Sequence, residues 1–419
     1  MNAEERNDTW KGWIILMLLF VVAILNYLDR SMIFTMRKSI VSSIPMTDAQ
    51  FGLLTTVFSW VYGAFCPVAG FLADRFKKTY LIIGSLFVWS LVTMMTGYVT
   101  TYQQLFVARA LMGISEAFFL PAALSLIMEC HKKQALAIGI LFFGEMLGSS
   151  LGFLGGRIAA YHSWNEAFRL FGLAGMTYAV FLIFTLRKVA YTPVKEQKKA
   201  APETPKIPVG TTLKSLFSKW PFFLLLLIYP LPTIVSWMVS GWLPTYYQEQ
   251  FFLTESDAGY YATACLYPLS AIGLIVGGFI TDKWQKSYPY ALIVVPIIGF
   301  GVAAPCVFLT GYVHVLWYAI GLFMIYGFAR MFIDTNLMPI LCMVIDKRHR
   351  ATGYGIINML TVFTGGMSVY VAGALHDAQI SLGTMFQYAS LGMMLCVVLL
   401  LLVKRAVKKN ETELNNKNL

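Results

Sequence analysis

The sequence predicts an all-α membrane protein with twelve transmembrane helices in two pseudo-symmetric six-helix bundles. Three observations predict this fold: an apolar composition, long apolar stretches along the whole chain, and one residue cluster that occurs twice. Of 419 residues, 58% are hydrophobic and 13% are charged, whereas globular domains carry about 25% charged residues. Stretches of about 20 apolar residues are long enough to cross a bilayer as helices and too uniformly apolar for barrel strands.

Twelve stretches are predicted as membrane spans. The first half holds Trp13–Ile40, Gln50–Ala73, Tyr80–Tyr98, Gln103–Met128, Ala135–Ile158 and Ala167–Leu186. The second half holds Pro221–Tyr247, Gly259–Ile280, Tyr290–Thr310, Val315–Val344, Thr352–Leu375 and Met385–Val403.

The segment between the halves and the chain end are polar. Residues 188–219 contain four prolines and many lysines, which predicts a solvated cytoplasmic linker. Residues 408–419 are predicted to form a disordered cytoplasmic tail. The domains expected are therefore an N-terminal bundle at 1–187 and a C-terminal bundle at 220–407.

A nine-residue cluster recurs half a chain apart. Gly70–Lys78 reads GFLADRFKK, and Gly278–Lys286, 208 positions later, reads GFITDKWQK. Each copy follows the second long apolar stretch of its half. Two related halves that rock around a site between them are typical of transporters.

The charged residues of this cluster suggest a gate. Asp74 and Asp282 are expected just past helix ends, where each can pair with the basic residue that follows, such as Arg75. Gly70 and Gly278 would let helices approach closely. We expect the cluster to latch the cytoplasmic ends together in one state of the protein.

The distribution of Lys and Arg predicts the topology. Twenty-five of the 32 basic residues fall on one side of the predicted membrane, and four fall on the other. By the positive-inside rule both termini are cytoplasmic. The membrane that we expect is a plasma membrane, namely the bacterial inner membrane. The net charge of +11 is therefore explained by the membrane topology and by contact with the lipid bilayer. It does not indicate binding to a nucleic acid.

The motifs of enzymes and metal sites are missing from the sequence. The chain has no HExxH and no Cys/His cluster with metal-ligand spacing, so neither an enzyme nor a metal site is expected. The six cysteines are scattered within or at the ends of the spans. No cofactor is expected, and we expect a monomer.

Ionisable residues inside the spans are the candidate functional residues. A charged side chain at the centre of a membrane costs about 2.5–3.5 kcal/mol, so it usually faces the interior of the helix bundle and has a partner. The spans contain at least seven: Asp29, Arg30, Arg109, Glu116, Glu145, Arg330 and Asp334.

Helical spacing predicts how these residues face. Neighbours on a helix point about 100° apart, so the side chains of Asp29 and Arg30 cannot both point to the same place in the bundle. Arg109 and Glu116 are two turns apart and share a face. Arg330 and Asp334 are four residues apart and can pair with each other, so a purely structural pair remains open.

Glycines recur at every fourth position of the fifth span, at Gly144, Gly148, Gly152 and Gly156. Such a stripe is a packing surface for another helix. Glu145 lies beside the stripe and has no basic neighbour on its own span, so a neutral, hydrogen-bonded role is also open.

The repeated loop resembles the signature between the second and third helices of the major facilitator superfamily, and its second copy matches that family's internal repeat. Within the superfamily, the segment Asn26–Arg30 resembles the first-helix motif of the anion:cation symporters, which take up sugar acids. The segment Arg109–Ala122, with a proline five residues after the glutamate, is similar to that group's fourth helix. Segments Trp242–Tyr246 and Gly355–Asn358 fit its seventh and eleventh helices.

The resemblance implies proton-coupled import of a small organic anion by alternating access, driven by the proton gradient. Asp29 and Glu116 would carry protons. Arg30 would meet the substrate carboxylate, because a guanidinium is a fork of donors that stays charged. Tyr27, Tyr62 and Asn358 would line the site.

The other intramembrane ions join this expected substrate site: Arg109 and Arg330 because unpaired cations favour an anion, and Glu145 as an unassigned carboxylate. Two alternatives stay open. A spinster-like lipid transporter shares the Asn-Tyr-x-Asp-Arg start, and a nutrient sensor without transport can use the same fold.

Overall fold

The computed structural model describes the whole chain except residues 1–2, 132–133, 189–214, 219, 346–349 and 418–419. Every regular element in this part is a helix, and twelve segments are long and apolar enough to cross a membrane. The predicted number of spans and the fold class are confirmed. The predicted linker lies largely outside the described residues.

By their internal contacts the helices form two compact units, which are described separately. The first unit comprises residues 1–201 and 243–264, and the second comprises 202–242 and 265–419. The segment 243–264 therefore belongs to the first unit although it lies in the second half of the sequence.

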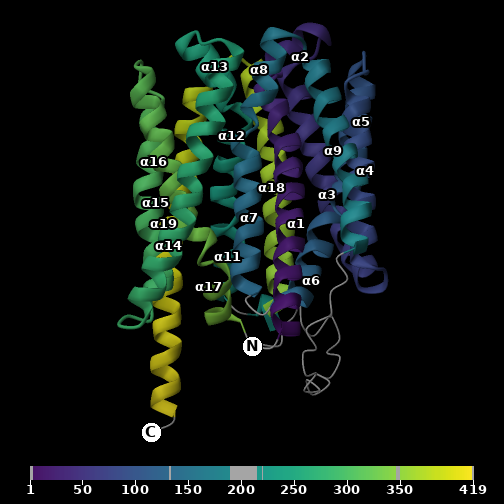
Figure 1. Ribbon diagram of the computed structural model, residues 1–419. Coiled ribbons are helices and arrows are strands. Elements are labelled where there is room, and N and C mark those ends of the chain that lie inside the picture. The colour runs from purple at the N-terminus through teal and green to yellow at the C-terminus, as the bar shows by residue number, and fades with distance from the viewer. Residues whose placement is uncertain (1–2, 132–133, 189–214, 219, 346–349, 418–419) are drawn as a thin grey trace. The chain divides into compact units, whose positions relative to one another are not determined.

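The first half of the chain forms nine helices among the described residues. They are α1 Ala3–Thr35, α2 Arg37–Ser43, α3 Asp48–Arg75, α4 Lys78–Thr96, α5 Tyr102–Glu116, α6 Phe119–Cys130, α7 Gln134–Ser150, α8 Phe153–Tyr161 and α9 Trp164–Lys188. Within the first unit α1 packs along α7, α3 along α5 and α4 along α9 (Figure 1).

The second half of the described chain contains ten further elements. They are α11 Trp220–Ile228, α12 Pro230–Phe251, α13 Glu255–Tyr260, the π-helix η1 Tyr261–Cys265, α14 Leu266–Gln285, α15 Ala291–Thr310, α16 Leu316–Asp334, α17 Leu337–Val344, α18 Arg350–Asp377 and α19 Leu382–Lys417. Within the second unit α15 packs against α16 and α19, and α14 packs against α16 (Figure 1).

The helix ends differ from the predicted ends in three places. The first span ends at Thr35 rather than Ile40, because the backbone leaves the helix at Met36 before α2 begins. The repeated acidic residues were expected past helix ends, but Asp74 and Asp282 lie in the last turns of α3 and α14. Residues 408–417 continue α19 as helix.

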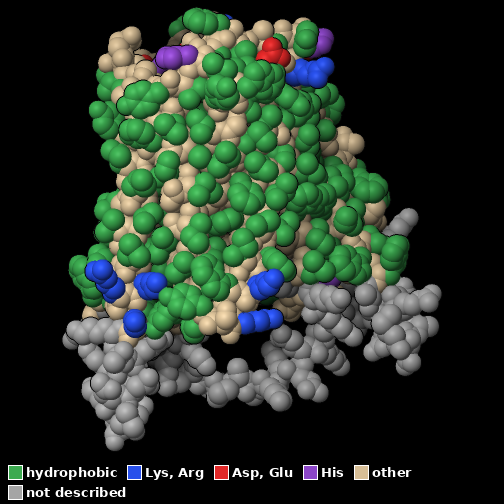
Figure 2. Space-filling view, turned by 90° about the vertical axis from the view of Figure 1, so that its left-hand side faces the viewer, with side chains coloured by type: hydrophobic (Ala, Val, Ile, Leu, Met, Phe, Trp, Pro, Cys, Tyr) green, Lys and Arg blue, Asp and Glu red, His purple; other side chains and the backbone are tan. Residues whose placement is uncertain are grey.

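The surface matches a chain that lies in lipid. On the face drawn in Figure 2, hydrophobic side chains cover the middle and charged side chains gather at the two ends. Large apolar residues such as Phe184, Ile275 and Phe279 are exposed. In water such a surface would aggregate, whereas a bilayer covers it.

The glycine stripe of the fifth span packs against α1, as the sequence predicts. A Cβ added at Gly144, Gly148, Gly152 or Gly156 would meet α1 at 3.0 Å or less. Only glycine allows this distance, because any larger residue would push the helices apart. The stripe therefore holds one face of α7 and α8 directly on α1.

Candidate functional site

The fourth span breaks directly after Glu116. Helix α5 ends at Glu116, and α6 begins three residues later with Pro121 as its third residue. A proline has no N–H to donate to the carbonyl four residues earlier, here that of Ala117, so one helical hydrogen bond is lost beside the break. The break leaves Glu116 at a helix end in the interior of the first unit, where its residue is 1% exposed.

Arg30 of α1 forms an ion pair with this carboxylate. The Arg30 Nε donates to Glu116 Oε2 at 2.6 Å. The guanidinium lies over three rings, with its Cζ 4.9 Å from the centroid of Tyr27, 5.0 Å from that of Phe58 and 4.6 Å from that of Tyr62. Charged pairing and the ring faces together hold the cation in one position.

Asp29 faces a different helix from Arg30, as the 100° offset predicts. The Thr93 hydroxyl of α4 donates to Asp29 Oδ2 at 3.1 Å, and Asp29 is 3% exposed. Its charge acts on Glu116 and Arg109 without direct contact. Arg30 therefore contacts Glu116 directly, whereas the charge of Asp29 acts on Glu116 from a distance.

Arg109 is a buried cation without an ion pair in the described part of the chain. It is 1% exposed, and its Nε has no hydrogen-bond partner. Its contacts are the Phe58 ring, 4.9 Å from Cζ, and the Met112 sulfur, 3.4 Å from Nη1. Asp29 and Glu116 offset its charge only at longer range. Such a guanidinium favours an anion nearby.

Glu145 is positioned by the glycine stripe. Gly144 and Gly148 hold α7 on α1 at Phe20 and Ile24, which turns the Glu145 side chain toward the next turn of α1. There Tyr27 and Arg30 of α1 are the groups that act on its carboxylate.

The structure brings seven of the predicted site residues together inside the first unit, on four helices: Tyr27, Asp29, Arg30, Tyr62, Arg109, Glu116 and Glu145. Two guanidiniums and three carboxylates give this cluster a net charge of −1 when all are ionised. Buried atoms also remain without partners, namely Asn26 Nδ2 and Glu116 Oε1. A cluster with more acids than bases and unused donors can exchange protons and accept a polar ligand.

The predicted residues of the second unit are arranged differently. Arg330 Nη2 donates to Asp334 Oδ2 on the same helix at 3.2 Å, so the pair expected from the sequence exists. Asn358 of α18 is exposed.

The tenth span breaks at the same offset as the fourth. Helix α16 ends at Asp334, and α17 begins three residues later with Pro339 as its third residue. Each proline therefore lies five residues after an acid. The sequence reasoning missed this second break, although the acid–proline spacing is readable in the printed sequence.

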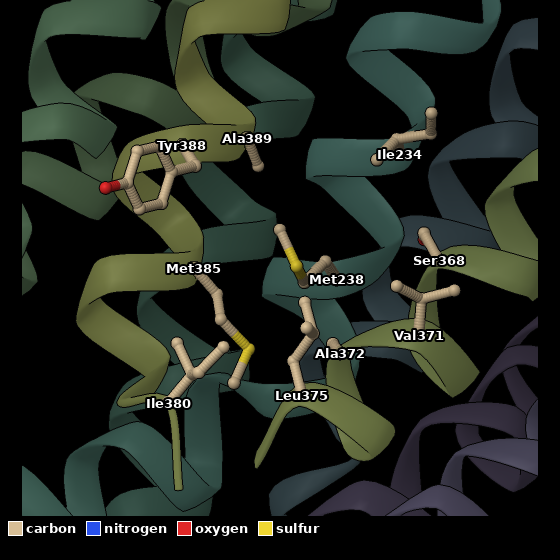
Figure 3. A pocket seen from close by; sticks show the side chains of 10 residues that line it. All are labelled: Ile234, Met238, Ser368, Val371, Ala372, Leu375, Ile380, Met385, Tyr388 and Ala389. Atoms are coloured by element: carbon tan, nitrogen blue, oxygen red, sulfur yellow. The ribbon is translucent and has the colours of Figure 1, made fainter. Parts of the chain in front are cut away.

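A pocket of about 340 Å³ lies within the second unit (Figure 3). Its walls come from α12, α18, α19 and the connection between the last two helices. No charged residue lines it; the lining residues are Ile234, Met238, Ser368, Val371, Ala372, Leu375, Ile380, Met385, Tyr388 and Ala389. Such a lining suits an alkyl chain and not a carboxylate.

The residues of the predicted gate are Gly70, Asp74, Arg75 and Asp282. A Cβ added at Gly70 meets no described atom within 4 Å. Arg75 lies over the Phe71 ring with its Cζ 4.0 Å from the centroid. Asp282 is exposed, and the side chain of Asp74 lies outside the described residues.

Two side chains of the site were not expected from the sequence. Phe58 lies under both guanidiniums, and Thr93 binds Asp29. Phe58 is four residues before Tyr62, so the two share a helix face, and this spacing was the available signal. A lone threonine in an apolar span gave no signal for Thr93. Among the described residues, no three His, Cys, Asp or Glu side chains could hold a metal ion.

Comparison with known proteins places the chain among transporters. A family model described as Major Facilitator Superfamily matches residues 19–369. Protein spinster homolog 1 of Xenopus laevis is 26% identical over 387 residues, which cover 87% of this chain and 73% of that protein. The hexuronate transporter of Bacillus subtilis is 26% identical over 281 residues, which cover 65% of each chain.

A solved structure has the same fold. The inward-facing, unoccupied bacterial homolog of the human lysosomal transporter spinster aligns with a TM-score of 0.74 at 20% identity, over 94% of this chain and 95% of that one. At this identity the likeness concerns the fold alone.

Proposed function

Because this chain belongs to the major facilitator superfamily, we propose that it is a proton-coupled symporter that imports a small organic anion, namely a sugar acid such as a hexuronate or an aldonate. It is an integral multi-pass membrane protein. The proposal places it in a bacterial plasma membrane with both termini in the cytoplasm.

The observation that carries this proposal is the buried ion pair of Arg30 with Glu116, at 2.6 Å. The Arg30 side chain is 21% exposed, whereas that of Glu116 is fully buried. A ligand therefore has access to the cation of the pair and not to the acid. A substrate carboxylate can replace Glu116 on Arg30 only if the displaced acid takes up a proton, because an unpaired buried carboxylate is costly.

This exchange couples the transport of the proton to that of the substrate. A proton on Glu116 releases Arg30 for the substrate, and departure of the substrate lets the pair form again with loss of the proton. Arg109, a buried cation without an ion pair among the described residues, adds to the attraction for an anion. Asp29, whose charge acts on Glu116 without direct contact, is the second proton carrier of the proposal.

The test is uptake by the purified protein in proteoliposomes, with a panel of radiolabelled hexuronates and aldonates. We expect accumulation of at least one of them when the outside is made acidic. The Glu116→Gln variant should lose accumulation but keep part of the exchange of internal for external substrate. Accumulation by Glu116→Gln under the same pH gradient would refute the coupling, and a complete lack of transport by the wild type would favour a sensor.

A lipid-like substrate is the second candidate, and the uncharged pocket of the second unit favours it. The resemblance to spinster proteins points the same way, and the Xenopus relative matches 87% of this chain. The pocket would hold the alkyl chain of such a substrate. Competition by lysophospholipids, with no effect of any sugar acid in the panel, would select this candidate.

A further inference from the structure

One hairpin from the second half of the sequence packs with the first half. Residues 243–264, which run from the end of α12 through α13 into η1, belong to the first compact unit, whereas the flanking residues 202–242 and 265–419 belong to the second. Residues 252–254 alone connect α12 to α13. Figure 1 shows α13 with α2 and α8 at the end of the first unit that lies opposite the N-terminus.

Glu255, the first residue of α13, binds α2 with both oxygens of its carboxylate. The Ser39 N–H donates to Glu255 Oε1 at 3.0 Å, and the Ser39 hydroxyl donates to Glu255 Oε2. The N-cap residue of α2, Met36, makes no side-chain hydrogen bond, so Glu255 supplies from the second half what a local cap would otherwise supply. Glu255 is 8% exposed, and hydrogen bonds to such a carboxylate are strong ones.

Glycines bring the backbones together beside this contact. A Cβ added at Gly259 of α13 would lie 3.1 Å from Thr35 Cβ of α1, and one added at Gly156 of α8 would lie 3.3 Å from the Glu255 carbonyl oxygen. The Thr35 hydroxyl donates to the Gly152 carbonyl at 2.9 Å and accepts from the Gly156 N–H at 3.1 Å. Small residues permit this close packing, so α1, α8 and α13 form one continuous seam.

The hairpin joins the rest of its own half through two irregular helical segments. On α12 the boundary of the first unit falls directly after Trp242, and Pro244 lies inside the helix two residues later. At the other end the boundary falls directly after Ala264, within the π-helix η1. Helices bend at prolines and at π-helical turns, because the regular hydrogen-bond ladder is interrupted there.

We propose that residues 243–264 are a movable outer gate, held closed on the first half by the hydrogen bonds of Glu255 to Ser39, and that the gate opens by bending at Pro244 and at η1. The inference rests on the proposed symport, whose topology places this end of the unit outside the membrane, and goes beyond it. Alternating access requires the site to close to one side before it opens to the other. Weakening these hydrogen bonds therefore shifts the population toward the state that is open to the outside.

The first experiment reads the position of the hairpin without any substrate. Ala258 of α13 is 0% exposed, so a cysteine placed there reacts with an impermeant maleimide, added from outside, only when the hairpin has moved away. Glu255→Gln puts an amide donor against Ser39 and should raise the labelling rate of Ala258→Cys roughly tenfold, as expected for the loss of a hydrogen bond to a charged group. The wild type with its six cysteines gives the background.

A matched control and two further variants sharpen this measurement. Asp257→Asn changes an exposed acid of the same helix that bonds to Thr254, so it should leave the labelling rate unchanged. Ser39→Ala removes one donor and should give a smaller increase than Glu255→Gln. It also replaces Glu255→Gln if that variant does not fold. Pro244→Ala in the Glu255→Gln background should lower the labelling rate again, because a straight α12 resists bending.

The second experiment fixes the hairpin in place. In the Ser39→Cys/Glu255→Cys variant a short bifunctional methanethiosulfonate joins α2 to α13, and a reducing agent releases them. Exchange of galacturonate, or of the panel member that the wild type transports, should fall about tenfold or more in proteoliposomes and recover on reduction. The control is Arg37→Cys/Asp48→Cys, since that ion pair joins α2 to α3 within the first half. Its exchange should not change with the reagent.

Two outcomes overturn the outer gate. One is an unchanged labelling rate in both Glu255→Gln and Ser39→Ala, and the other is a cross-linked variant that exchanges substrate as fast as before the reagent. A wild type that transports no sugar acid overturns the proposed symport instead. The labelling experiment then still decides about the gate, because it uses no substrate.

Discussion

The fourth and tenth spans are broken in the same way but place the acid at the break in opposite surroundings. In each span the helix ends at the acid, and a proline, Pro121 or Pro339, lies five residues after it as the third residue of the next helix. Glu116 is fully buried and pairs with a residue of another helix. Asp334 has a side chain that is 41% exposed and pairs within its own helix.

The difference shows what the acid–proline spacing, which both spans share, contributes. The acid–proline spacing sets where the helix ends and leaves backbone groups free at the break. Whether the acid then titrates during transport depends on what it touches. A buried carboxylate on a partner helix ties protonation to helix packing, whereas an exposed carboxylate four residues from its partner changes little when it is protonated.

The largest expected difference concerns stability. Glu116→Ala leaves the Arg30 guanidinium without its partner in a largely buried site, which should cost on the order of 3 kcal/mol. Asp334→Ala breaks a partly exposed pair and should cost about 0.5 kcal/mol or less. Thermal unfolding of both variants in the same detergent measures the two losses. Equal losses would mean that the two breaks are equivalent.

The two arginines should differ in transport. Arg30→Lys keeps the charge but loses the fork of donors, so kcat/KM for uptake should fall roughly 10- to 100-fold, as expected when a charged hydrogen bond is lost. Arg330→Lys should stay within about threefold, because a lysine can still pair with an exposed acid. Initial rates of labelled substrate uptake give both values. A larger effect at Arg330 would move the centre of the site to the second unit.

The prolines test the breaks themselves. Pro121→Ala restores the N–H that can bond to the Ala117 carbonyl, so α5 and α6 can join and shift Glu116. A displacement of this kind should lower uptake about tenfold. Pro339→Ala should have a smaller effect because Asp334 is not at a buried site. The control is substrate binding by each variant in detergent. Loss of binding in both proline variants would indicate misfolding instead.

The smallest expected effect concerns the repeated loop. If Asp74 stabilises the state that is open to the outside, Asp74→Asn should shift the population and slow transport about two- to fivefold, while ligand binding remains. The second copy has fewer basic neighbours, so Asp282→Asn should be milder. Labelling of cysteines introduced at the two entrances reads the population. Unchanged accessibility in Asp74→Asn would leave the loop as a topology signal.

The sequence alone predicted the class of fold because membrane spans obey a local rule. An apolar stretch of sufficient length must form a helix in lipid, since every backbone group has to be bonded within its own segment. The number of spans needed only composition and length, and the family resemblance needed only the repeated loop and the segments Asn26–Arg30 and Arg109–Ala122. Helical spacing also predicted the pair of Arg330 with Asp334.

The tertiary structure decided which ionisable residues meet. No spacing rule connects Arg30 with Glu116, 86 residues apart, or Asp29 with Thr93, 64 residues apart, because those contacts depend on which helices pack together. The glycine stripe indicated close packing of the fifth span, but its partner, α1, was visible only in the fold. Charges inside a membrane are costly wherever they lie, so the sequence marks them, while the packing of helices determines which of them share a site.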